Sequence, residues 1–223
     1  MPPLAQPAPL RHFTPIVPSQ NSDPELVPLT PNLSIWHAYD PSVKAELFAA
    51  AFATNGSRYL VDPIPLPEPE FRKLKAAGPI NGIIVTNANH QRAAADFSKG
   101  LSVPVFAHRN TLGEINGLKT LDALTLHSPE NLEITEIEGA VAGEIAIYLP
   151  GDGGTLIIGD ALINFEPYGF TFLPRKYCLD QKQMRRSLRK LLSLSFKRMV
   201  FAHGTPILSS ASDRLRQLLE TDS

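Results

Sequence analysis

The chain has 223 residues, a net charge of -1 at pH 7 and a hydrophobic fraction of 43%. This length fits one domain with its own core, and the near-neutral charge provides no global positive excess to attract nucleic acid or anionic lipid. The single cysteine, Cys178, excludes an internal disulfide and a CxxC metal motif, which is typical of a reducing compartment. The sequence contains no apolar run of the length that a signal peptide or a membrane span requires. We therefore expect a cytoplasmic protein without a membrane anchor.

Proline is concentrated at the start of the chain, where nine of the 21 prolines fall within the first 31 residues. Proline lacks a backbone N–H and disrupts both helices and central strands. We therefore predict an extended arm over residues 1–31, followed by one domain over residues 32–223. Leu26, Val27 and Leu29 leave open the alternative that the end of the arm adds an edge strand to the domain.

The segment LSIWHAYD, from Leu33 to Asp40, predicts the first strand of the domain. The next segment, VKAELFAAAFAT, has a helix-forming composition. We nevertheless predict that it is a strand paired with RYLVD through the turn TNGS, because the topology proposed below requires a strand there.

A helix-containing unit follows. IPLPEPEFRKLKAAG predicts a loop and a short helix ending at Gly78. The strand NGIIVT, the polar segment NANHQR, the helix AAADFSKG ending at Gly100 and the strand VPVFAH then form a βαβ-like unit.

The second half of the chain begins with segments of period two: LEITEIEG, GEIAIYLP and TLIIGDALI. The last two are joined by GDGG, which predicts a hairpin. An aromatic and proline-rich loop, FEPYGFTFLP, leads to a helix over residues 180–194, the strand RMVFAHG and a final helix through SDRLRQLLE. Alternating strands and helices indicate an α/β fold or a two-layered sandwich flanked by helices.

A basic stripe marks the predicted helix over residues 180–194 and the residues after it, because KQMRRSLRKLLSLSFKR contains seven basic residues. Most such faces are simply solvated. An interaction surface for an acidic partner remains an alternative, and we do not expect nucleic-acid binding.

The order of these elements resembles the metallo-β-lactamase superfamily over residues 32–208. The resemblance rests on RYLVD with Asp62, on TNANHQR where the family has THxHxDH, and on strands ending in IIGDAL with Asp160 and VFAHG with His203. A glycine-flanked histidine of the family aligns with Ala140 in EGAVAGEIA. The resemblance implies a compact single domain built as a four-layered αββα sandwich, and hydrolytic activity at a metal centre.

The chain departs from the family at the metal-binding positions. The motif positions of the resemblance are occupied by Asn87, Asn89, Gln91 and Arg92, and only Asp160 and His203 remain of the seven residues that the family would use. Amides are poor oxygen donors, and a guanidinium has no lone pair to offer. We therefore expect no bound metal or other cofactor.

Arg92 suggests how the lost ion is replaced. We predict that its guanidinium forms a salt bridge with Asp160, while Asn87, Asn89 and Gln91 bond one another in a satisfied polar core. The structural interpretation of these amides is a loop that caps the following helix. His90 is expected to point away from the side chains at 87 and 89 if this loop is extended, which argues against His90 as a metal ligand.

The sequence therefore predicts a non-catalytic protein with a binding or structural role. Its expected partner is a small molecule in the former active-site cleft, and a second copy of the chain is also left open. The rival hypothesis is a hydrolase of esters, thioesters or lactones. Its unorthodox site would use Asp160 and His203 as catalytic candidates with a nearby histidine such as His90 or His37, and would contain zinc or iron.

Overall fold

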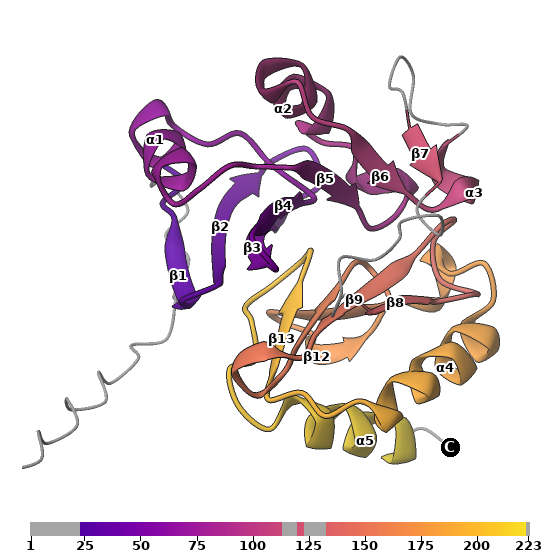
Figure 1. The fold of residues 1–223 in the computed structure, drawn as a ribbon. Coiled ribbons are helices and arrows are strands. Elements are labelled where there is room, and N and C mark those ends of the chain that lie inside the picture. Colours follow the sequence, from indigo (N-terminus) through magenta and orange to yellow (C-terminus); the bar gives the residue numbers. More distant parts are fainter. Residues whose placement is uncertain (1–22, 113–119, 123–132, 222–223) are drawn as a thin grey trace, which may run out of the picture.

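The computed structural model describes residues 23–112, 120–122 and 133–221 of the chain. Two β-sheets pack face to face, and helices cover the outer face of each sheet (Figure 1). Helices α1 (Glu68–Ala76) and α2 (Ala94–Leu101) lie on the first sheet, and α4 (Gln181–Lys190) and α5 (Ala211–Thr221) lie on the second. The predicted four-layered αββα sandwich is confirmed.

The first sheet has seven strands in sequence order, antiparallel from β1 to β4 and parallel from β4 to β7. Its strands are β1 (Val27–Thr30), β2 (Leu33–Asp40), β3 (Ala45–Thr54), β4 (Ser57–Val61), β5 (Gly82–Val85), β6 (Val105–Ala107) and β7 (Thr120–Asp122). Strand β1 pairs with β2 at the sheet edge, as the alternative for the end of the arm proposed. The predicted arm before residue 23 lies outside the described residues.

Strand β3 confirms the prediction made against its helix-forming composition. Phe48 and Phe52 face the second sheet, whereas the alternating Ala49 and Ala51 face the helix layer. Both faces of the strand are therefore buried, and packing overrides the helical preference of its alanines. Asn55 and the glycine after it both have positive φ, so the turn from β3 to β4 matches the twist of a tight hairpin.

Helix α2 ends later than its sequence predicted. The helix continues through Gly100 to Leu101, and Ser102 adopts the left-handed conformation with φ 56°. Its backbone N–H caps the carbonyl of Ser98, so the last turn is closed without a left-handed glycine. The prediction that Gly100 ends this helix is wrong.

The second sheet has four strands in the order β13-β10-β9-β8. These strands are β8 (Glu133–Glu136), β9 (Ile145–Leu149), β10 (Thr155–Ile158) and β13 (Arg198–Phe201). The β9–β10 hairpin is confirmed, with a short 3-10 turn η2 (Gly151–Gly153) between its strands. Strand β10 runs parallel to β13, so both strands end at the same edge of the sheet.

A small hairpin lies where the sequence predicted an aromatic loop. Strand β11 (Leu162–Phe165) pairs with β12 (Gly169–Phe172) in a separate two-stranded sheet. The prolines of this segment, Pro167 and Pro174, lie in its turn and after its second strand, which leaves GFTF free to pair. The remaining short elements are α3 (Arg109–Leu112) and the 3-10 turns η1 (Ala88–His90), η3 (Arg175–Tyr177) and η4 (Leu191–Ser193).

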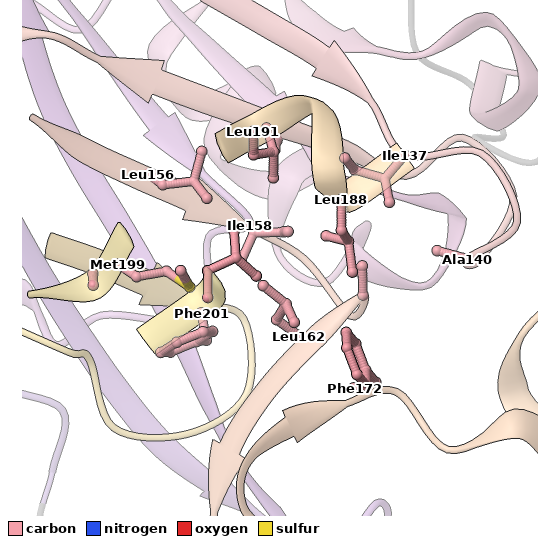
Figure 2. Packing of buried hydrophobic residues seen from close by; sticks show 14 of the residues in the cluster. Ile137, Ala140, Leu156, Ile158, Leu162, Phe172, Leu188, Leu191, Met199 and Phe201 are labelled. Carbon is pink, nitrogen blue, oxygen red and sulfur yellow. The ribbon is translucent and has the colours of Figure 1, made fainter. Parts of the chain in front are cut away.

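The helix predicted over residues 180–194 is observed as α4, which ends at Lys190 and is followed by the 3-10 turn η4. Asp180 caps the helix, since its Oδ1 accepts a hydrogen bond from the backbone N–H of Gln183 at 3.0 Å. Met184 and Leu188 are fully buried and pack with Ile158 and Phe201, as Figure 2 shows for three of these four residues. No helix of the described residues is long and apolar enough to cross a membrane.

Candidate functional site

The candidate site lies where four strands end. Asp62 follows β4, the segment Thr86–Arg92 follows β5, Asp160 follows β10 and His203 follows β13. Strands β4 and β5 are parallel in one sheet, and β10 and β13 are parallel in the other. Their carboxyl ends therefore bring polar residues from distant parts of the chain to one edge of the sandwich. We call the residues gathered there the polar cluster: Asp62, Asn87, His90, Arg92, Glu144, Asp160 and His203.

A single 3-10 turn determines which residues of NANHQR enter the polar cluster. Asn87 begins η1, and its Oδ1 accepts a hydrogen bond from the backbone N–H of Asn89 at 2.9 Å. The turn directs His90 inward, with 2% of its surface exposed, and leaves Asn89 exposed. The expectation that His90 points away from the site is wrong, because the segment is a turn and not an extended loop.

His90 lies between two carboxylates from different strands. Its Nδ1 is 3.0 Å from Asp62 Oδ2 and 2.9 Å from Thr86 Oγ1, and Thr86 also donates through its hydroxyl to Asp62 at 2.5 Å. Its Nε2 is 3.2 Å from Asp160 Oδ1. This second approach is close but is not aligned as a hydrogen bond, so Nε2 is a buried nitrogen without a hydrogen-bond partner.

The charges around His90 favour its protonated form. Burial alone lowers the pKa of this imidazole, but the carboxylates of Asp160 and Asp62 outweigh burial and raise the pKa to about 9. Burial conversely raises the pKa of Asp160, but His90, His203 and Arg92 together outweigh burial, so the pKa of this carboxyl lies below its ordinary value.

His203 completes a His/Asp/His group. Its Nε2 lies 3.4 Å from Asp160 Oδ1, and one ligand atom each from His90, Asp160 and His203 lie within 4.8 Å of one another. The side chain of His203 is 18% exposed, which makes it the most accessible member of this group. Burial lowers its pKa to about 4, so at pH 7 this imidazole is neutral.

Glu144 is a buried carboxyl that the sequence analysis missed. It directly precedes β9 and accepts hydrogen bonds from Asn87 Nδ2 at 2.7 Å and from the backbone N–H of Ala161 at 3.0 Å. The same Asn87 nitrogen lies 3.2 Å from Asp160 Oδ2. Burial, together with the charge of Asp160, raises the pKa of Glu144 to about 8, so this carboxyl is mostly protonated at pH 7. The position of this acidic residue between Gly143 and an apolar strand was the sequence feature that could have indicated a buried carboxyl.

Arg92 does not form the predicted salt bridge with Asp160. Its guanidinium donates to three backbone carbonyls, those of Phe48 at 2.6 Å, Asp62 at 3.2 Å and Ala202 at 3.2 Å. The side chain thereby ties the ends of β4 and β13 to β3. The prediction failed because these carbonyls converge closer to the guanidinium than the carboxylate of Asp160 does.

The other positions named by the sequence do not join the polar cluster. Ala140 is fully buried in the hydrophobic core beneath α4 (Figure 2). Gln91 is partly buried. His37 bonds Glu46 at 3.1 Å and stacks on Phe48. Of the three amides, Asn87 therefore forms the polar core that had been predicted for all of them, and His90, not His37, is the histidine near Asp160.

The backbone is strained at two residues of the polar cluster. Asp62 and Arg92 both have positive φ, at 45° and 39° respectively. Residues other than glycine adopt this region at a cost, and such strain persists only where the surrounding contacts enforce it. The bonds from Thr86 and His90 to Asp62, and from Arg92 to three carbonyls, supply that enforcement.

The polar cluster leaves no space for a side chain at Gly159. A Cβ at this position would lie 2.7 Å from Thr86 Oγ1 and 2.9 Å from both carboxyl oxygens of Glu144, which are held by their own hydrogen bonds. We expect Gly159→Ala to lower the free energy of unfolding by about 1–3 kcal/mol, measured by urea denaturation. Gly151→Ala is the matched control, because its Cβ would meet nothing within 4 Å. Equal stability of the two variants would contradict tight packing around Gly159.

The described part of the chain has surface cavities of about 720 and 260 Å³. Neither is lined by His90, Asp160 or His203, although Glu144 borders the smaller one. The larger cavity lies elsewhere on the molecule. The predicted ligand-binding cleft at Asp160 and His203 therefore does not coincide with either cavity.

Comparisons with known proteins support the assignment of the fold. The model of the metallo-beta-lactamase superfamily matches residues 28–222. The crystal structure of the DIM-1 metallo-beta-lactamase superposes with a TM-score of 0.69 at 17% identity, covering 91% of this chain and 99% of that one. Metallo-beta-lactamases from Pontibacter korlensis (TM-score 0.68, 18% identity, 89% and 99% covered) and Erythrobacter litoralis (0.64, 15%, 89% and 93%) are also similar.

A search of curated proteins gave no match. The structural likenesses are all below one fifth identity, so they establish the fold and not the activity. The family model covers most of the sequence, including every residue of the polar cluster. The chain belongs to the metallo-β-lactamase superfamily.

Proposed function

We propose that this protein has a non-catalytic binding or structural role, and that an imidazolium replaces the metal centre of its family. The observation that carries the proposal is the position of His90, whose ring nitrogens lie 3.0 Å from Asp62 and 3.2 Å from Asp160. A protonated ring in this position compensates both carboxylates. Without this positive charge, burial of two ionised carboxylates would lower the stability of the folded protein.

The residues beside His90 support the same proposal. The amide nitrogen of Asn87 donates to Glu144 and approaches Asp160, so its contacts stabilise carboxyl oxygens and offer no lone pair to a cation. Arg92 brings a permanent positive charge to a position that the family uses for a ligand. Both side chains therefore stabilise negatively charged groups and oppose the binding of a metal cation.

The charge balance of the polar cluster is also satisfied without a metal. At pH 7 the carboxylates of Asp62 and Asp160 are offset by the cations of His90 and Arg92, while Glu144 is mostly protonated and His203 is neutral. A divalent ion would add charge to a neutral cluster. It would also have to displace the proton from His90 Nε2.

A second candidate function, hydrolysis at a single metal ion, is favoured by one observation. Two histidines and a carboxylate are the donor set of many hydrolytic zinc sites, and such a site with bonds of about 2.0–2.1 Å places its ligands about 3.3–3.4 Å apart. The approaches of His90 and His203 to Asp160, 3.2 and 3.4 Å, match these separations. Asp62 is hydrogen-bonded to His90 Nδ1. A carboxylate in this position commonly orients a metal-binding histidine without contacting the metal itself.

The residues present therefore fit zinc or iron, with His90, Asp160 and His203 as the ligands. Bound there, the ion would lower the pKa of a coordinated water towards 7 and so provide a nucleophile. Asp62 would hold the ring of His90, and His203, being partly exposed, lies on the side from which a substrate approaches. The two candidate functions thus differ in whether a proton or a metal ion occupies His90 Nε2.

Metal content and hydrolysis distinguish the two candidates. We expect purified protein, supplemented with zinc, iron or manganese, to contain far less than one ion per chain by elemental analysis, because the proton on His90 and the charge of Arg92 oppose binding. Ester, thioester, lactone and β-lactam substrates should not be hydrolysed above the level of His203→Ala. One ion per chain that is lost in both Asp160→Ala and His203→Ala, with turnover lost in parallel, would contradict the proposal and establish the hydrolase.

A further inference from the structure

A surface cavity lies at the opposite end of the strands that carry the polar cluster. We call it the basal cavity: a volume of about 720 Å³ bordered by Arg58, Thr155 and Arg198, among others. Arg58 is near the start of β4, and Thr155 and Arg198 begin β10 and β13. Asp62, Asp160 and His203 follow the other ends of these strands. Four to five residues at 3.3 Å each separate the two regions by about 15 Å.

Arg198 is a buried cation at this cavity, with 7% of its surface exposed. Its Nε donates to Thr155 Oγ1 at 3.1 Å, and its Nη2 donates to the backbone carbonyl of Asp152 at 2.5 Å. Both partners are neutral. Within the described residues, no carboxylate forms an ion pair with this guanidinium. Burying a charge without a counter-charge is costly, so an anion in the cavity would stabilise this arrangement.

Arg58 is a second cation on the wall of the cavity. Its Nη2 donates to the backbone carbonyl of Ala77 at 2.6 Å, while its buried Nε has no hydrogen-bond partner. In the part of the chain that the structure covers, it also has no ion pair with a carboxylate. Its guanidinium lies beside Gly78, where even a Cβ would be 3.8 Å away.

The remaining lining suits a polar ligand. Hydroxyls and amides surround the two arginines, from Thr30, Asn32, Thr54, Ser57 and Thr155. Asp152 is the one acidic residue on the wall of the described cavity, so the lining carries a net charge of one positive unit. The volume falls within the range of small-molecule sites, about 300–1,000 Å³.

We propose that the basal cavity binds a small organic anion whose phosphate or carboxylate group pairs with the guanidinium groups of Arg58 and Arg198. Guanidinium groups recognise both oxyanions through paired N–H donors, and the hydroxyls and amides bind the polar remainder of the ligand. This site does not depend on whether the polar cluster holds a proton or a metal ion. It gives the protein a ligand-binding region outside the family's metal centre.

Calorimetric titration with inorganic phosphate and, separately, with citrate tests the proposal at pH 7.5 and constant ionic strength. We expect saturable binding of at least one of the two anions, and the affinity should fall roughly tenfold or more in Arg198→Met and in Arg58→Met. Arg58 is only partly buried, so this variant remains informative if Arg198→Met does not fold. A preference between the two anions identifies the oxyanion that the site takes.

Two controls make the outcome decisive. Arg72→Met removes an exposed arginine outside the cavity, with 69% of its side chain exposed, and should bind as the wild type does. His203→Gln changes the polar cluster and should also leave anion binding intact. Absence of saturable binding by both anions overturns the proposal. It is equally overturned if binding persists in both cavity variants or is lost in His203→Gln, which would place the anion at the polar cluster.

Discussion

Replacement of His90 by glutamine is expected to lower the free energy of unfolding by about 3–5 kcal/mol at pH 7. The substitution removes the cation between Asp62 and Asp160 and leaves two buried carboxylates without their partner. Urea denaturation followed by circular dichroism, with a chelator present, measures the change. The chelator ensures that the measured stability belongs to the protonated ring and not to a bound ion.

His37→Gln is the matched control, because His37 is partly buried and, like His90, contacts a carboxylate, that of Glu46 at 3.1 Å. This pair is more exposed and contains only one carboxylate, so its loss should cost no more than about 1 kcal/mol. A similar loss in both variants would show that His90 has no special compensating role. The proposal of an imidazolium core would then fail.

The effect of His90→Gln should also depend on pH. The pKa of His90 in the folded protein, about 9, lies above the ordinary value of 6.5. Its stabilisation is therefore complete below pH 6.5 and is lost as the pH rises through 9. The stability difference between wild type and variant should shrink by roughly 3 kcal/mol between pH 6.5 and 9.5. A difference that stays constant over this range would contradict protonation of His90.

Two neighbours titrate as well, and the comparison with the variant removes their contributions only in part, because the charge of His90 lowers the pKa of both. The pKa of Glu144 is raised to about 8, so its contribution also falls as the pH rises. It does so in both proteins. The pKa of His203 is lowered to about 4, so the unfolded chain binds a proton first and stability falls as the pH drops from 6.5 towards 4. Between about pH 4.5 and 6.5 the effects of Glu144 and His203 oppose each other, and above pH 6.5 both Glu144 and His90 lose their contributions, so wild-type stability should be greatest at about pH 4.5–6.5.

The fold was largely predictable from the sequence because its signals are local. Alternating apolar residues in GEIAIYLP and TLIIGDALI, together with the GDGG turn, are sufficient to predict the β9–β10 hairpin. Strand β3 was the exception, since its alanines favour a helix. Its strand conformation depends on burial of Ala49 and Ala51 under the helix layer, which only the topology of the family indicated.

The site was less predictable because its contacts join residues far apart in the chain. Asn87 and Glu144 are 57 positions apart, so no local pattern indicates their hydrogen bond. The inward direction of His90 depends on one 3-10 turn. An extended loop, which was assumed for the prediction, would direct this side chain the opposite way. Residue types alone led to the expectation that most of the family's metal ligands are replaced. They did not show which side chain had entered the space between the carboxylates.

Arg92→Met is expected to lower the free energy of unfolding by about 3–5 kcal/mol, because it leaves the carbonyls of Phe48, Asp62 and Ala202 without their common donor. These carbonyls belong to segments of both sheets, so the loss loosens the edge of the sandwich that carries the polar cluster. Arg92→Lys should recover only part of the stability, since one ammonium group does not span the three acceptors. Urea denaturation of both variants measures this order.

A double-mutant cycle separates this role from the predicted salt bridge. Arg92 bonds carbonyls and acts on Asp160 only through its charge, so the coupling between Arg92→Met and Asp160→Asn should stay below about 1 kcal/mol. His90 contacts Asp160 at 3.2 Å, and the cycle of His90→Gln with Asp160→Asn should give a coupling above about 1 kcal/mol. An Arg92–Asp160 coupling as large as that of His90 would mean that arginine, and not histidine, compensates the carboxylate. Unchanged stability of Arg92→Met would exclude any structural replacement of the metal by Arg92.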